Sequence, residues 1–141
     1  AWVHLNRDAD VLVGLKERQD QIAKVAPDVS VSLHYNALPD AGDAQNIRGV
    51  GGFWFHPQAH SLAKALHDAL TTPLGRPSYG LWWDNLALAR PSGTPSVLME
   101  LGFLTNPEDF EWCADPANRP KVAGAIADGL AAWLRASRTA P

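Results

Sequence analysis

Two titratable side chains stand near the ends of strand-like segments of this sequence. Glu100 interrupts an apolar run at residues 96–103 that is typical of a buried strand in a parallel or mixed sheet. Because an ionised carboxylate is costly to bury alone, Glu100 is expected to have a counter-ion, a hydrogen-bond donor or a metal beside it. His34 stands near the end of a second β-prone segment, residues 29–35. Ligands of open α/β sheets bind beyond the carboxyl ends of the strands, so His34 and Glu100 are predicted to face one crevice if these strands run parallel.

Simpler interpretations of these residues stay open at this point. A single histidine at the end of a strand is most often structural or exposed to solvent, and Glu100 alone could form a structural ion pair with Arg90. His56 and His60 are four residues apart, which on a helix is the spacing of metal ligands. Pro57 favours the first turn of a helix, however, so His56 is predicted to cap that helix or to end the preceding strand rather than to bind a metal.

The spacing of apolar residues and turn residues predicts an α/β protein. Strands are expected at residues 2–6, 29–35, 51–56, within 79–90 and at 96–103, and helices at residues 15–26, 57–70, from 107 onward and at 120–136. Residues 37–52 are expected to form a loop, and His67 is expected on a polar helix face. This order predicts a mostly parallel mixed sheet flanked by helices on both faces, in one domain spanning residues 1–141.

The composition argues against several classes of partner. The 141 residues carry a net charge of −3 and no basic block, so no nucleic acid is expected to bind. No apolar run is long enough to span a membrane, and no signal peptide is visible in this chain. The single Cys113 allows no intramolecular disulfide and no cysteine cluster for a metal. Four of the six tryptophans are expected to pack in the core or at its edge, namely Trp2, Trp54, Trp112 and Trp133.

Several segments match one known family in order and spacing. They are Leu-Asn-Arg-Asp at 5–8, Leu-Lys-Glu-Arg at 15–18, Val-Ser-Leu-His-Tyr-Asn-Ala at 31–37, Leu-Ala-Arg at 88–90 and Met-Glu-Leu-Gly-Phe-Leu-Thr-Asn-Pro-Glu-Asp at 99–109. The chain resembles the zinc-dependent N-acetylmuramoyl-L-alanine amidases of the Amidase_3 family along nearly its whole length. The segment at 99–109 is the most specific part of the resemblance.

The resemblance implies a zinc site and roles for two residues. In this family a His, a Glu and a second His hold the zinc ion, and a further Glu acts in catalysis. His34 matches the second His and Glu100 matches the catalytic Glu. The first His and the metal-binding Glu are expected upstream of residue 1, so the first strand of the family's fold is expected to be absent from this chain. An upstream peptide segment is therefore predicted to complete the domain.

The resemblance also implies a substrate. It predicts hydrolysis of the amide bond between N-acetylmuramic acid and L-alanine in peptidoglycan, by a secreted or cell-envelope protein such as an autolysin. Asn36 is predicted to position the loop after His34 or the substrate, and Arg90 is predicted to bind a carboxylate of the peptide stem. Trp82 and Trp83 are candidates for stacking on the glycan or the peptide.

Two other functions stay open on the sequence. The chain could be a non-catalytic cell-wall-binding or regulatory relative that has lost its metal site, which the missing pair of ligands favours and Glu100 disfavours. It could also be a zinc carboxypeptidase with a related site, against which the segment at 101–108 argues. The short loops at 37–52 and 75–85 leave little room for an occluding element, so an open cleft is expected.

Overall fold

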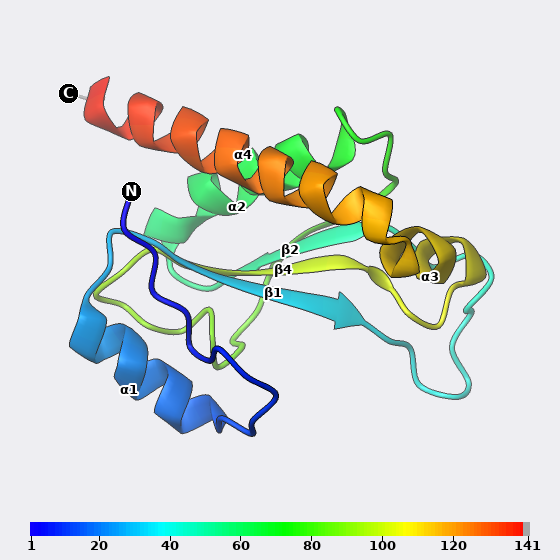
Figure 1. Cartoon of the computed structure of the whole chain (residues 1–141), viewed down its shortest axis with the longest axis horizontal. Coiled ribbons are helices and arrows are strands. Elements are labelled where there is room, and N and C mark those ends of the chain that lie inside the picture. Colours follow the sequence, from blue (N-terminus) through cyan, green and yellow to red (C-terminus); the bar gives the residue numbers. More distant parts are fainter. Residues whose placement is uncertain (140–141) are drawn as a thin grey trace.

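The computed structural model describes residues 1–139 and has one four-stranded sheet with helices on both faces (Figure 1). The strands are β1 (Ser30–Asn36), β2 (Val50–Trp54), β3 (Ser78–Trp83) and β4 (Ser96–Phe103). The helices are α1 (Leu15–Val25), α2 (Pro57–Thr71), α3 (Pro107–Ala114) and α4 (Arg119–Thr139), with a short 3-10 helix at Pro116–Asn118. No helix within residues 1–139 is long and apolar enough to cross a membrane.

The sheet is mixed, as the sequence predicts. Its strand order is β1-β4-β2-β3. The pairs β1–β4 and β2–β3 are parallel, whereas β2 and β4 are antiparallel. The parallel pair β2–β3 needs a crossover connection, which α2 supplies.

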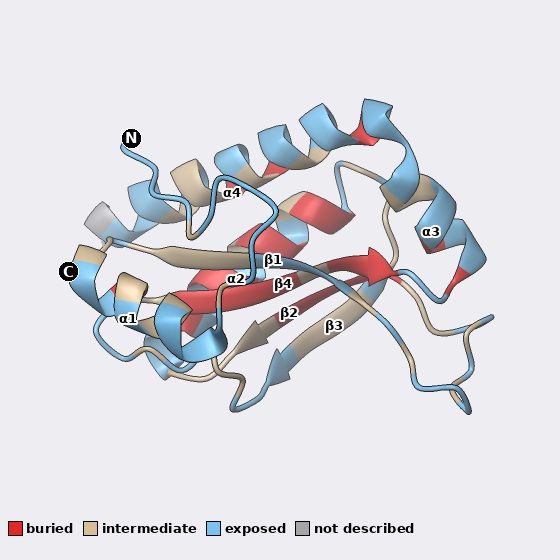
Figure 2. Ribbon diagram, turned by 60° about the horizontal axis from the view of Figure 1, so that its bottom comes forward, coloured by how far each residue is buried: buried red, intermediate tan, exposed pale blue. Residues whose placement is uncertain are grey.

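The core lies between the sheet and the pair α2 and α4. Alternate residues of β4, namely Val97, Met99 and Leu101, belong to one cluster with Leu62 and Leu66 of α2. Helix α1 lies across the opposite face of the sheet from α2 and α4 (Figure 1). Figure 2 shows that β4 is the most buried strand; β4 and β2 are the two strands with a neighbour on both edges. Residues 96, 98 and 100 alternate with the core residues and therefore face the α1 side.

The expected strand at residues 2–6 is wrong. The chain is irregular from residue 1 to residue 14, and Trp2 is 77% exposed rather than packed against the core. The apolar side chains of Val3 and Leu5 are also exposed. A strand is stable only when a neighbour pairs its backbone groups, and no strand of the described residues lies beside this segment. The segment is joined to α1 instead, through a 2.8 Å hydrogen bond from Asn6 Nδ2 to Gln21 Oε1.

Other elements begin and end close to their expected bounds. Helix α2 starts at Pro57 with His56 as its N-cap in an extended conformation, which confirms the prediction for His56. The prediction for His67 is wrong, because this side chain is buried and does not lie on a polar helix face. Its Nε2 lies 2.9 Å from Ser78 Oγ, so the imidazole joins α2 to the start of β3.

Candidate active site

His34 and Glu100 are neighbours across two parallel strands. They are register partners in the β1–β4 ladder, and Glu100 lies opposite Gly51 on its other side, in β2. Paired residues of adjacent strands point to the same face of a sheet, and Met99 next to Glu100 points to the core. His34 and Glu100 therefore project together from the α1 face, which confirms that they share one side of the sheet.

Glu100 is a carboxylate without a partner. Its Oε2 is buried and accepts no hydrogen bond from the described residues. Burial raises the pKa of Glu100 from 4.5 to about 7. Within residues 1–139 no ion pair or hydrogen bond joins Glu100 to Arg90. The alternative that Glu100 forms a structural ion pair with Arg90 is therefore wrong. A carboxyl group with a free oxygen and a raised pKa is suited to taking up and releasing a proton.

His34 is exposed at the side of Glu100. Burial of part of the ring and the positive charge of Arg18 on α1 both lower the pKa of His34. The neutral imidazole is therefore favoured at neutral pH, and this is the form that binds metals. Neither ring nitrogen of His34 has a hydrogen-bond partner among the described residues. Two residues that are paired in register thus carry a ring nitrogen and a carboxylate oxygen without hydrogen-bond partners among the described residues.

The described residues do not make a complete metal site. Catalytic zinc is usually held by three protein ligands, and a neutral imidazole such as that of His34 is a suitable member of such a set. In the part of the chain that the structure describes, no group of three or more His, Cys, Asp or Glu side chains could hold a metal ion. The imidazole of His34 thus fits zinc, but one ligand is too few to hold the ion.

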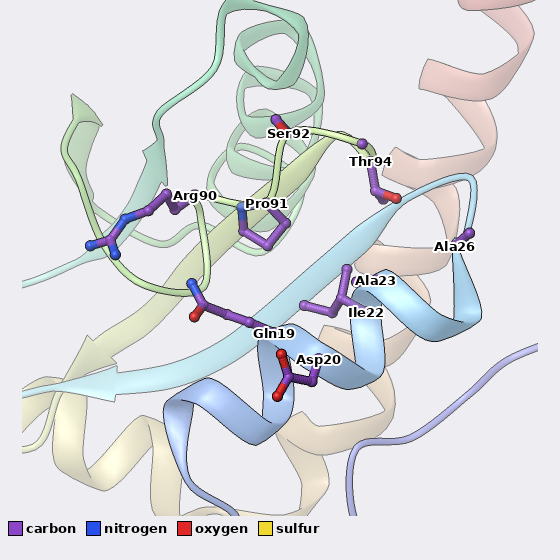
Figure 3. A pocket seen from close by; sticks show the side chains of 10 residues that line it. Gln19, Asp20, Ile22, Ala23, Ala26, Arg90, Pro91, Ser92 and Thr94 are labelled. Carbon is purple, nitrogen blue, oxygen red and sulfur yellow. The ribbon is translucent and has the colours of Figure 1, made fainter.

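Asn36 and Arg90 lie near opposite ends of the sheet, Asn36 at the end of β1 and Arg90 before the start of β4. Asn36 ends β1, and its Oδ1 accepts a 2.8 Å hydrogen bond from Ala37 N, so its carbonyl is used to shape the following loop. Arg90 precedes β4, and its Nε donates to Asn85 Oδ1 over 2.7 Å. It lines a cavity of about 460 Å³ between α1 and residues 90–94 (Figure 3). Neither residue contacts His34 or Glu100 through a hydrogen bond, and their roles in substrate binding stay predictions.

The cavity beside Arg90 lies on the same side of the sheet as the pair. Gln19 and Asp20 of α1 form one wall, and Pro91 and Thr94 form the other (Figure 3). Gln19 Nε2 donates to Ala87 O over 2.7 Å, which holds α1 against the segment before β4. The cavity continues the α1 face toward the amino ends of β1 and β4, away from the end that carries His34 and Glu100.

A buried ion pair stands where the loop before β2 meets the end of β4. Asp109 Oδ1 accepts from Arg76 Nη2 over 2.6 Å, with side chains only 1% and 6% exposed. Asp109 Oδ2 accepts from the backbone N–H groups of Gly49 and Phe103 at 2.7 and 2.8 Å. These bonds join the end of the 37–49 loop to the end of β4, three residues after Glu100.

The ion pair was missed at the sequence level, where Asp109 is only one of the acids in the first turn of a helix. The helix cap itself is confirmed, since Asn106 Oδ1 accepts from Asp109 N over 3.1 Å. A cap residue followed three positions later by an acid is a visible signal. Nothing in the spacing points to Arg76, which lies 33 residues earlier.

The fold is similar to that of solved N-acetylmuramoyl-L-alanine amidases. The catalytic domain of CwlV, an amidase of this kind from Bacillus (Paenibacillus) polymyxa, superposes with a TM-score of 0.86 at 26% identity, covering 95% of this chain and 73% of that one. An N-acetylmuramyl-L-alanine amidase of Mycobacterium smegmatis superposes with a TM-score of 0.78 at 28% identity, covering 93% and 66%.

Residues 1–132 match the family model Amidase_3, N-acetylmuramoyl-L-alanine amidase, and the chain belongs to this family. A probable cell wall amidase of Staphylococcus epidermidis, LytH, is 33% identical over 130 residues, which are 92% of this chain and 42% of that protein. The Staphylococcus aureus protein of the same name is 29% identical over 136 residues, or 96% of this chain and 44% of that one. The chain thus spans less than half the length of these curated relatives.

Proposed function

We propose that this chain forms part of an enzyme that hydrolyses the amide bond between N-acetylmuramic acid and L-alanine in peptidoglycan. The observation that carries the proposal is the register pairing of His34 with Glu100, each with a free polar atom on the same face of the sheet. Membership of the amidase family supports the same reaction. Since peptidoglycan lies outside the cytoplasm, the protein would act in the cell envelope or after secretion.

The proposed cofactor is zinc, with His34 as one ligand. The other two ligands, a His and a Glu, would come from a peptide segment outside these 141 residues. Two features support a further segment beside β1. β1 is the last strand of the sheet and has an unpaired edge. Trp2, Val3 and Leu5 expose apolar side chains that a neighbouring segment would cover. When bound, zinc supplies a Lewis acid that polarises the scissile carbonyl and eases deprotonation of a water molecule.

Glu100 is the proposed general base and acid. It takes a proton from the attacking water, whose oxygen forms the new bond to the carbonyl carbon. As the carbon–nitrogen bond breaks, Glu100 returns the proton to the leaving amine of L-alanine. The products are the carboxylate of the lactyl group and a free peptide amine. The unpartnered Oε2 and the raised pKa both support this role, because the carboxyl group is not committed to a structural partner.

Arg90 and Asn36 have proposed roles in substrate binding. The guanidinium of Arg90 is suited to a carboxylate of the peptide stem, and only its Nε and Nη2 are used by Asn85. Asn36 would act by shaping the loop that follows His34, through its bond to Ala37 N.

Muropeptide cleavage by the full-length protein tests the proposed reaction. A disaccharide-peptide should yield a free peptide with L-alanine at its amino terminus and an intact disaccharide, both identified by mass spectrometry. A second candidate, a non-catalytic cell-wall-binding or regulatory relative, is favoured because no group of three metal ligands exists among the described residues. That relative would bind peptidoglycan and release no peptide, so retention of the muropeptide in unchanged form would discard the hydrolase.

A further inference from the structure

The β2 side of Glu100 is lined by aromatic rings because Gly51 has no side chain. A β-carbon at Gly51 would lie 3.1 Å from Tyr79 Cδ1, 3.3 Å from Phe53 Cε2 and 3.7 Å from Glu100 Cβ. The rings of Phe53 and Tyr79 therefore approach over Gly51 to the side of the Glu100 carboxylate. By contrast, a β-carbon at Gly52 would meet Leu81 and Met99 on the core side of the sheet.

Trp82 extends this aromatic surface toward solvent. It is the register partner of Phe53 in the β2–β3 pair, and its ring centroid lies 5.5 Å from that of Tyr79 at an interplanar angle of 44°. Trp82 is 45% exposed. Among the described residues, neither its Nε1–H nor the Tyr79 hydroxyl has a hydrogen-bond partner. We call Phe53, Tyr79 and Trp82 the aromatic platform.

Trp83 is next in the chain but belongs to the other face of the sheet. It pairs with Trp54, which packs against the α2 side, and it stacks on Phe55 at 5.6 Å and 25°. Its Nε1 already donates to Phe55 O over 3.0 Å. Although Trp83 is the more exposed of the two at 64%, its polar atom is used and its ring lies away from Glu100.

The two sides of Glu100 thus differ in chemistry. The β2–β3 side carries aromatic rings with a free N–H and a free hydroxyl, whereas the β1 side carries His34 with the cation Arg18 beyond it. A pyranose ring has an apolar face of C–H bonds and a rim of polar groups, which suits aromatic rings with free donors. A peptide stem carries carboxylates, which suit the cationic side.

We propose that the aromatic platform binds the sugar ring next to the scissile amide, so that the glycan lies over β2 and β3 and the peptide stem runs toward β1 and α1. This inference rests on the proposed function for the identity of the substrate. It deepens that function by assigning a sugar subsite to Trp82 and Tyr79, and it makes Trp82 rather than Trp83 the tryptophan that contacts the glycan.

Binding of peptide-free glycan strands by the full-length protein tests the subsite independently of catalysis. The probe is an oligosaccharide of alternating N-acetylglucosamine and N-acetylmuramic acid, titrated by calorimetry. The Trp82→Ala variant is expected to bind about threefold to tenfold more weakly than the wild type, because it loses the ring contact. Trp82→Phe keeps a ring and should retain most of the affinity. Trp83→Ala is the matched control and should bind within twofold of the wild type.

Hydrolysis of two substrates separates this inference from the proposed function. For a sugar-bearing muropeptide, Trp82→Ala should raise KM about threefold to tenfold with little change in kcat. For a lactyl-peptide that lacks the sugar, Trp82→Ala and the wild type should have the same KM. Equal glycan affinity of Trp82→Ala and Trp83→Ala would overturn the subsite, and so would an equal effect on both substrates. A protein that binds the glycan through Trp82 but cleaves neither substrate would refute the proposed function alone.

Discussion

Removal of the Asp109 carboxylate should destabilise the domain more than any other single charge deletion on α3. In the Asp109→Ala variant, Arg76 remains buried without its counter-ion, and the N–H groups of Gly49 and Phe103 lose their acceptor. Breaking a buried ion pair from one side costs about 3–5 kcal/mol. Each buried donor left unpaired adds about 1–3 kcal/mol unless water reaches it. A loss of at least about 3 kcal/mol is expected from a total stability of about 5–15 kcal/mol.

Equilibrium urea unfolding, followed by tryptophan fluorescence, measures this loss. Glu108→Ala is the matched control, since Glu108 is the neighbouring acid on α3 and forms an exposed ion pair with Arg48. Its side chain is 74% exposed, so its loss should cost less than about 1 kcal/mol. A double variant, Arg76→Met with Asp109→Leu, should recover part of the loss, because it removes both buried charges. Equal free energies of unfolding for Asp109→Ala and Glu108→Ala would refute the reasoning.

Three further perturbations have expected outcomes. Since the pKa of Glu100 is raised from 4.5 to about 7, its contribution to the stability of the metal-free fold is full below pH 4.5 and is lost as the pH rises through 7. The loss would be about 3 kcal/mol for a fully buried group and is about 1–2 kcal/mol here, because the side chain is partly solvated. In urea unfolding with a chelator present, Glu100→Gln should therefore lose less stability than the wild type between pH 5 and pH 8, and an identical loss would contradict the raised pKa. Asn106→Ala removes the α3 cap and the bonds from Asn106 Nδ2 to Ala44 O and Gln45 O. It should lower the free energy of unfolding by about 1–2 kcal/mol and speed amide hydrogen exchange in residues 37–49. Unchanged exchange in these residues would show that Asn106 does not tether the loop. Leu66→Ala leaves a cavity between α2 and the sheet and should cost about 2–5 kcal/mol in thermal unfolding, whereas a cost under 1 kcal/mol would mean that this core collapses to fill it.

The sequence was sufficient for most of the regular elements and for placing His34 and Glu100 on strands that share one crevice. The apolar run around Glu100 and the β-prone segment around His34 predict two strands, and a parallel arrangement brings both side chains to the same end of the sheet. Their common face follows from the register of the two strands. The predicted helix starts at Pro57 and Pro107 are also confirmed, because a proline in the first turn and a cap residue are local signals.

Features that depend on contacts between distant residues could not be predicted in this way. The segment at residues 2–6 has the composition of a strand, but a strand also needs a paired neighbour, and composition does not show one. The split between Trp82 and Trp83 depends on the register shift between Val50 and Gly51, where the β2–β3 pairing skips Tyr79. A shift of one residue exchanges the two faces of a strand, so the sequence could name both tryptophans but could not choose between them.

The most direct test of the central claim is a paired measurement of zinc content and turnover on the full-length protein. The wild type should bind one zinc ion per chain and cleave the muropeptide. Glu100→Gln should keep the zinc and lose turnover by at least about 100-fold, because a general base contributes that much. His34→Ala should lose the zinc and the activity together. Turnover in Glu100→Gln within a few-fold of the wild type, or full zinc content in His34→Ala, would contradict the account.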